Sequence, residues 1–224
     1  MSTTSSVESF TTFLQNWLEH QQHYLNQLVK IENSTETVNK QQLIKNLLSH
    51  YANYYEEKSK IIWDDTHLLF SPPWLTTLEK AFLWVGGFKP TLAFTLLEAS
   101  VSNMEPSQVE KVQQLKMETI KEEHNLKEAL VMVQESMGSR MLSSLDRDGD
   151  GLVDGEVSEF DEVMQELKTS MARVIQNADN LRRNTMMGVF RILDLDQNLK
   201  FLIALLKYQL GVRAYGLQND ARRG

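Results

Sequence analysis

Residues 71–90, SPPWLTTLEKAFLWVGGFKP, place two tryptophans between a proline pair and a glycine pair. Proline suits the first turn of a helix, where its missing N–H leaves no hydrogen bond unmade. Glycine suits the residue after a helix, because it adopts the left-handed cap conformation without a Cβ clash. The spacing therefore predicts one apolar helix over 73–85. Trp74, Phe82 and Val85 would share its apolar stripe, either as core or as the floor of a binding groove.

Almost every other long segment has the 3.6-residue apolar period of an amphipathic helix. Only 4 prolines and 10 glycines interrupt 224 residues, which is too few turn signals for a fold of many short strands. We therefore predict an all-α bundle of about seven helices, in which two long helices of the C-terminal half are joined by an acidic Gly- and Asp-rich loop. The expected helices span about 6–32, 37–61, 73–85, 90–101, 107–137, 158–191 and 196–210.

The composition argues against several classes of protein. Cysteine is absent, so the chain has no disulfide, thiol nucleophile or cysteine metal site. No apolar run approaches the roughly 20 residues that cross a bilayer, and we expect no membrane segment. The sequence contains no phosphate-binding glycine loop, nucleophile elbow or His-Glu-x-x-His pair. These observations favour a protein that is not an enzyme.

Four motifs occur in a recognisable order, and the first is an opening helix that carries Phe13, Trp17, Leu25 and Leu28. The central one, Trp…Glu-x-Ala-x-x-Trp-x-Gly-Gly-x-x-Pro, is formed by Trp74, Glu79, Ala81, Trp84, Gly86, Gly87 and Pro90. The block His50-Tyr51-x-x-Tyr54-Tyr55 precedes it, and the block Ala178-Asp179-Asn180-Leu181-Arg182-x-x-Thr185 follows it. Together they resemble the plant Delay of Germination domain, which also forms the C-terminal part of TGA-type leucine-zipper transcription factors.

The resemblance implies one such domain over 7–217, with a disordered N-terminus at 1–6, a variable loop at 138–157 and a tail at 218–224. It implies a regulator in seed dormancy and abscisic-acid signalling that acts through protein contacts and restrains type 2C protein phosphatases. The expected location is the nucleus, the cytoplasm or both, and self-association is open. Two readings of the central motif stay open, a groove for a partner protein and a slot for a ligand, for which TGA relatives suggest a fatty acyl chain. The groove residues would be Trp74, Glu79, Trp84, Gly86, Gly87 and Pro90.

A second hypothesis is an accessory module of transcription, with sequence-specific DNA binding inherited from TGA factors. No basic region followed by heptads is present, so its local support is the C-terminal charge. Residues 180–224 carry eight basic against three acidic side chains, in a chain of net charge −7. Such a segment suits a phosphate or an acidic partner. The candidate basic residues are Arg182, Arg183, Arg213, Arg222 and Arg223.

A third hypothesis is a calcium-responsive switch in the stretch 146–157, which partly matches an EF-hand loop. The candidate ligands are Asp146, Asp148, Asp150, the carbonyl of Leu152, and Asp154. Val157 stands where an EF-hand places its bidentate glutamate, so only weak calcium binding is expected. The alternative is a solvated connector, for which Asp and Gly clusters are ordinary.

Heme is the cofactor that the resemblance raises, because seed-dormancy relatives are thought to hold it through two histidines near their C-terminus. The matching positions in this chain are Gln209 and Arg213. Neither side chain is a usual ligand of heme iron. We therefore expect no heme and no other resident cofactor.

Overall fold

Seven α-helices form in the residues that the structure describes, 3–147 and 154–223. This computed structural model confirms the predicted all-α class, and in these two ranges it has no strand, only an isolated antiparallel bridge between Trp84 and Gly87. A 3-10 turn, η1 (Thr66–Leu69), follows the second helix. The helices are α1 (Thr3–Ile31), α2 (Thr37–Asp64), α3 (Thr77–Ala81), α4 (Leu92–Ser100), α5 (Pro106–Arg147), α6 (Asp154–Ile192) and α7 (Leu195–Ala221).

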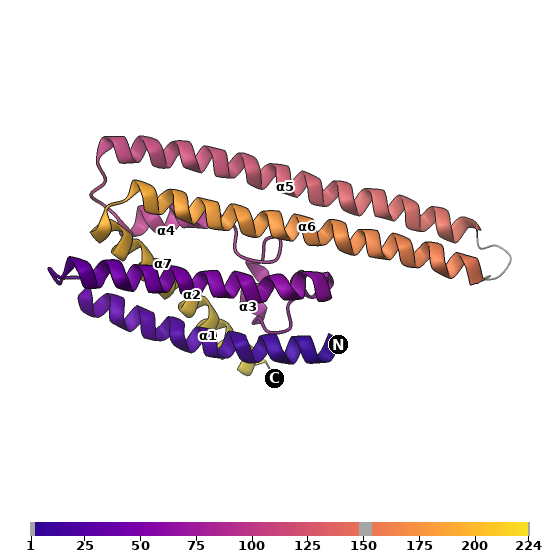
Figure 1. Cartoon of the computed structure of the whole chain (residues 1–224), viewed down its shortest axis with the longest axis horizontal. Helices are drawn as coiled ribbons and strands as arrows, with labels where there is room; N and C mark the ends of the chain where they lie inside the picture. Colours follow the sequence, from indigo (N-terminus) through magenta and orange to yellow (C-terminus); the bar gives the residue numbers. More distant parts are fainter. Residues whose placement is uncertain (1–2, 148–153, 224) are drawn as a thin grey trace.

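The helices form a bundle from which one pair projects (Figure 1). α1 and α2 lie antiparallel, and α7 packs across both of them. α6 packs on α2 and also runs along α5. α5 and α6 continue past the other helices as a two-helix arm, and α5 forms one edge of the molecule (Figure 1). None of the described helices is long and apolar enough to span a membrane.

Apolar side chains fill the bundle in separate clusters. One cluster joins α1 and α2 to Trp74, whose ring lies 4.7 Å from that of Phe10 between centroids. A second cluster packs α7 against α1 and α2, and a third packs α4 against α7 through Phe94 and Phe201. Burial of each such side chain contributes about 1.5–3 kcal/mol, so these contacts and not local propensity hold the helices together.

Several predicted boundaries are wrong, and in each case the helix is longer. Residues 3–6 are helical and not disordered, and α7 continues to Ala221 through most of the expected tail at 218–224. α5 extends to Arg147 and α6 begins at Asp154, so the connection predicted at 138–157 is short. Gly138 does not stop α5, because a glycine inside a helix costs only about 1 kcal/mol and α6 packs alongside.

The helix predicted over 73–85 is also wrong, because α3 contains only five residues, Thr77–Ala81. Trp74 lies before it and is buried, whereas Phe82 caps its C-terminal end and is 49% exposed. Thr76 begins α3 in a capping box. Carbonyl groups that a longer helix would have used internally instead accept hydrogen bonds from two arginines of distant helices.

Candidate ligand and partner site

Residues 70–91 connect η1 to α4 with little regular structure, and we call them the crossing segment. Arg213 of α7 and Arg182 of α6 both bind it. Backbone N–H and C=O groups that leave water need hydrogen-bond partners, so an irregular segment inside a bundle depends on such side chains.

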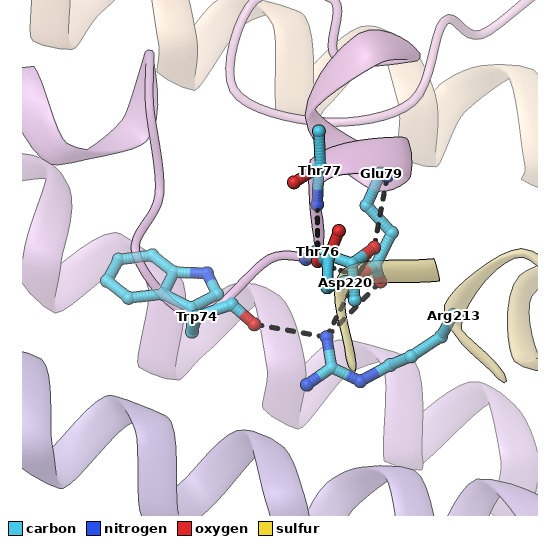
Figure 2. A network of polar contacts seen from close by, with 6 residues as sticks. All are labelled: Trp74, Thr76, Thr77, Glu79, Arg213 and Asp220. Atoms are coloured by element: carbon cyan, nitrogen blue, oxygen red, sulfur yellow. Dashed lines mark hydrogen bonds and ion pairs between the residues drawn. The ribbon is translucent and has the colours of Figure 1, made fainter. Parts of the chain in front are cut away.

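Arg213 joins α7 to the start of α3 (Figure 2). Its Nη1 donates to the carbonyl of Trp74 and to Oε2 of Glu79, each at 3.0 Å. Oε2 of Glu79 also accepts from the backbone N–H and the hydroxyl of Thr76, each at 2.8 Å. The Arg213 and Glu79 side chains are 16% and 9% exposed, so this ion pair is largely shielded from water.

α7 makes two more contacts with the same turn. The backbone N–H of Thr77 donates to Oδ2 of Asp220 at 2.9 Å (Figure 2), and this hydrogen bond lowers the pKa of Asp220. Gly216 is buried, and a Cβ placed on it would lie 2.2 Å from Oγ1 of Thr76. Only a glycine at this position lets α7 approach the crossing segment so closely.

Arg182 holds the other end of the crossing segment. Its Nε donates to the carbonyl of Phe88 at 2.7 Å, and its Nη2 donates to the carbonyls of Val85, at 2.9 Å, and Trp84. Its Nη1 donates to Oδ1 of Asp179 at 2.5 Å. The guanidinium carbon also lies 5.4 Å from the ring centroid of Trp84. A lysine has no planar fork of donors and could not make this set of bonds.

Gly86 and Gly87 shape the turn to which Arg182 donates its hydrogen bonds. Val85 and Gly86 have φ of 42° and 72°, and positive values at both central positions are typical of a type I′ turn. Trp84 and Gly87 close it with hydrogen bonds of 2.7 and 3.1 Å. A Cβ on Gly87 would lie 2.8 Å from the guanidinium carbon of Arg182, so this glycine provides the space for the arginine.

A buried lysine completes the Arg182 cluster. Nζ of Lys58 lies 2.7 Å from Oδ1 of Asp179, and the Lys58 side chain is 2% exposed. Burial lowers the pKa of Lys58 to about 8, and the charge of Arg182 adds to this shift while Asp179 opposes it. Asp179 thus stands between two cationic side chains inside the bundle.

A neutral polar cluster lies where α1, α2 and α7 meet. Nε2 of Gln21 donates to the hydroxyl of Tyr51 at 2.9 Å and to Oε1 of Gln209 at 2.6 Å. The Tyr51 hydroxyl donates to the same Gln209 oxygen at 2.7 Å. Burial raises the pKa of Tyr51. In this orientation of the amide, the buried Oε1 of Gln21 accepts no hydrogen bond from the protein.

These networks surround a cavity of about 450 Å³ between the crossing segment and helices α1, α2, α4, α6 and α7. Apolar and aromatic side chains such as Trp17, Phe190 and Leu202 form most of its wall. Gln21, Lys58 and the two arginines supply polar groups at separate places. Small-molecule sites of about 300–1,000 Å³ have this character, with an apolar wall and a few polar groups that orient the ligand.

The structure brings most of the predicted groove residues to this cavity. Those that line it are Trp74, Glu79, Gly86, Gly87 and Pro90. Trp84 does not line it and lies against Arg182 instead.

The predicted basic segment does not form one surface. Arg182 is buried and Arg213 is half-buried, and both are engaged by carboxylates and backbone carbonyls. Arg183 is exposed beside the cavity, while Arg222 and Arg223 are exposed at the end of α7. The number of charges along residues 180–224 did not predict that these arginines lie apart, because it does not show which of them have buried partners.

The proposed calcium ligands cannot be assembled from the described residues, because Asp148, Asp150 and Leu152 lie outside them. Asp146 is in the last turn of α5 and Asp154 begins α6. Of the two positions considered above for heme, Gln209 accepts a hydrogen bond from Tyr51 and Arg213 donates one to Glu79. Weak calcium binding and the lack of heme both stay predictions.

Sequence reasoning missed Gln21 and Lys58, although a signal was present. Gln21 follows Trp17 by four residues and precedes Leu25 by four, so it occupies an apolar-stripe position. Lys58 likewise stands four residues after Tyr54 and four before Ile62. A polar side chain on such a stripe is buried and needs a hydrogen-bond or ion-pair partner. Its position therefore indicates a polar network inside the bundle.

The chain is similar in sequence to known plant proteins over most of its length. A family model described as "DOG1: Seed dormancy control" matches residues 20–99. Protein ZW2 of Arabidopsis thaliana is 36% identical over 97% of this chain and 100% of its own length, and Protein RESPONSE TO ABA AND SALT 1 of the same plant is 35% identical over 95% and 97%. Transcription factor TGA2.3 of Oryza sativa subsp. japonica is 26% identical over 88% of this chain but only 60% of its own length.

Gly216→Ala should lower the free energy of unfolding by about 1–3 kcal/mol, because the added methyl group would overlap Thr76. The matched control is Gly211→Ala on the same helix, where a Cβ would meet nothing within 4 Å. That change should raise stability by about 0.5–1 kcal/mol through helix propensity. Urea denaturation measures both. Equal effects of the two substitutions would contradict the close approach of α7.

Asp179→Asn should lower the free energy of unfolding by about 3–5 kcal/mol at pH 6, because Lys58 and Arg182 would lose their shared buried counter-charge. The loss of unfolding free energy should be smaller at pH 9, because a pKa of about 8 leaves most Lys58 side chains neutral at that pH. Glu98→Gln is the control: it removes the exposed partner of Lys116 and should cost less than about 1 kcal/mol. Chemical denaturation at the two pH values provides the measurement, and a penalty that does not change with pH would contradict a charged Lys58 at pH 6.

Proposed function

Because the chain belongs to the seed dormancy control (DOG1) family, we propose that it is a plant regulator that works by protein contact and not by catalysis. The observation that carries the proposal is the similarity to Protein RESPONSE TO ABA AND SALT 1 over almost the full length of both chains. This supports a role in the response to abscisic acid. Similarity to TGA transcription factors supports a link to transcription and a nuclear location.

The recognition surface that we propose is the outer face of the crossing segment. Thr77, Lys80, Ala81 and Phe82 are exposed there, while the two arginines fix the backbone on either side of them. A surface held rigid before binding loses little conformational entropy when a partner docks. Phe82, a large aromatic side chain that is half exposed, suits an anchor in a partner's pocket.

The partner that we propose is a type 2C protein phosphatase, which the chain would restrain. Direct DNA contact receives less support, since two of the five candidate basic residues have internal partners. A role in transcription through contacts with other proteins is compatible with the crossing segment as the contact surface.

Affinity capture with the full chain from seed tissue, followed by phosphatase assays, tests this function. We expect type 2C phosphatases to be retained and inhibited, and Phe82→Asp to weaken retention at least about tenfold. Val38→Asp is the matched control, because Val38 is 76% exposed at the start of α2, far from α3 in sequence. Retention of other proteins without any phosphatase would overturn this partner, and equal loss with both variants would overturn the surface.

The cavity favours a second candidate function, capture of an apolar ligand such as a fatty acyl chain. Its volume and apolar wall suit such a molecule, and the unpaired Oε1 of Gln21 would accept a hydrogen bond from a protonated polar group on it. A ligand there would also contact the residues that hold the crossing segment.

Titration with the fluorescent fatty acid cis-parinaric acid tests this capture. We expect Ala52→Trp to weaken binding at least about tenfold, because Ala52 lines the cavity and is itself exposed, so a larger side chain obstructs the entrance. Ala99→Trp on α4 is the control, since Ala99 is exposed and does not line the cavity. Equal affinity of all three proteins would place the fatty acid elsewhere.

A further inference from the structure

Lys58 of α2 combines burial with a place on the cavity wall. Its side chain is only 2% exposed, and both Lys58 and its partner Asp179 line the cavity. Lys89 also lines the cavity, but its side chain is 55% exposed and pairs with Glu123. Burial disfavours the ammonium form of a lysine, and the neutral amine that results is a nucleophile.

The cluster around Asp179 holds two cations for one carboxylate. Oδ1 of Asp179 lies 2.7 Å from Nζ of Lys58 and 2.5 Å from Nη1 of Arg182. Burial raises the pKa of Tyr54 and Tyr55, so these neighbours on α2 are neutral and add no negative charge. An arginine keeps its proton in proteins, whereas a lysine can lose it. When Lys58 is neutral, Asp179 and Arg182 therefore remain a balanced pair.

The amine of Lys58 also has unused hydrogen-bonding capacity. A lysine ammonium carries three N–H donors. Within residues 3–147 and 154–223, Oδ1 of Asp179 is the one acceptor to which Nζ donates. A ligand atom that approaches Nζ from the cavity consequently has no second protein hydrogen bond to displace.

We propose that Lys58 captures aliphatic aldehydes by forming a reversible imine inside the cavity. This inference rests on the proposed capture of an apolar ligand, and it specifies the group at the end of the ligand's chain. The carbonyl carbon would bond to Nζ, and the alkyl chain would lie along the apolar wall. Lysines form such imines where the amine is desolvated or lies beside another cation, and Lys58 meets both conditions.

The reaction uses the residues of this cluster and one proton from solvent. The neutral Nζ attacks the carbonyl carbon, and the electron pair of the C=O double bond moves to oxygen. Asp179, whose Oδ1 lies 2.7 Å from Nζ, accepts a proton from the nitrogen and passes it to that oxygen. A solvent proton then lets the hydroxyl group leave as water while the nitrogen lone pair forms the C=N bond. Overall, an ammonium and an aldehyde give an iminium and one water, without an oxidant or a reductant.

The product keeps the charge pattern of the free protein. The iminium has one positive charge and one N–H, which can donate to Asp179 as the ammonium does now. The capture therefore leaves no buried charge without a partner. The apolar wall limits the access of water, which slows hydrolysis of the imine.

Reductive trapping of the unaltered full chain tests the site. Sodium cyanoborohydride converts an iminium into a stable secondary amine, and peptide mass spectrometry then locates the added alkyl group. With decanal at pH 7, we expect Lys58 to carry at least about tenfold more decyl groups than Lys60, whose side chain is 62% exposed. The reason is that a pKa of about 8 in place of 10.5 raises the neutral fraction of Lys58 roughly 300-fold at this pH. Decyl groups spread over the exposed lysines, with no excess at Lys58, would overturn the proposal.

Variants test whether the aldehyde reaches Lys58 through the cavity. Ala52→Trp obstructs the entrance and should lower labelling of Lys58 at least about tenfold, while labelling of Lys60 in the same protein stays unchanged. Ala99→Trp, outside the cavity, should change neither. Lys58→Arg keeps a cation beside Asp179 but removes the amine, and circular dichroism checks that it keeps its helices. Equal labelling of Lys58 in the two tryptophan variants would contradict capture inside the cavity.

Parallel titration with cis-parinaric acid separates this inference from the proposed capture of a fatty acid. A chain that binds the fatty acid but gains no decyl group at Lys58 overturns the imine and leaves the capture function standing. A decyl group at Lys58 without affinity for the fatty acid supports the imine and overturns fatty-acid capture. A chain that shows neither result overturns both.

Discussion

The interior of this protein depends on two arginines that hydrogen-bond to backbone carbonyls of the crossing segment. Arg182 and Arg213 donate to the carbonyls of Trp74, Trp84, Val85 and Phe88. An irregular segment that lacked these donors would leave partly buried carbonyls unpaired, each at a cost of up to about 1–3 kcal/mol. The carboxylates of Glu79 and Asp179 balance the charge of the arginines, and the glycines of the segment give the guanidinium groups room.

Local periodicity predicted the elements that pack through a continuous apolar stripe. α2 and α4 lie within a few residues of the expected ranges, as does the beginning of α5. The same reasoning failed over 73–85, because the hydrogen bonds that break the helix come from α6 and α7, about 100 residues or more away. The capping pair Thr76 and Glu79 is readable in the sequence, but the apolar stripe outweighed it. Gln21 and Lys58 were missed for a related reason: periodicity identifies a buried position without identifying its polar partner.

The cavity and the proposed recognition surface share residues. Glu79 and Gly87 line the cavity and also fix the two ends of the crossing segment whose outer face carries Phe82. A molecule in the cavity that favours one arrangement of Arg182 or Arg213 would change how rigidly the outer face of the crossing segment is held. Coupling of this kind is reciprocal, so a partner that binds the face would change the affinity of the cavity for its ligand by the same factor.

The separation along the chain between the arginines and their acceptors has a kinetic consequence. Arg182 lies 98 residues from Trp84, and Arg213 lies 134 residues from Glu79. The α1–α2 and α5–α6 hairpins need far shorter loops to close, and contacts between distant residues form slowly. The two hairpins should consequently assemble early, while the crossing segment should dock between the helices as one of the final events of folding. Until that moment the space inside the bundle is open to whatever the surrounding solution contains.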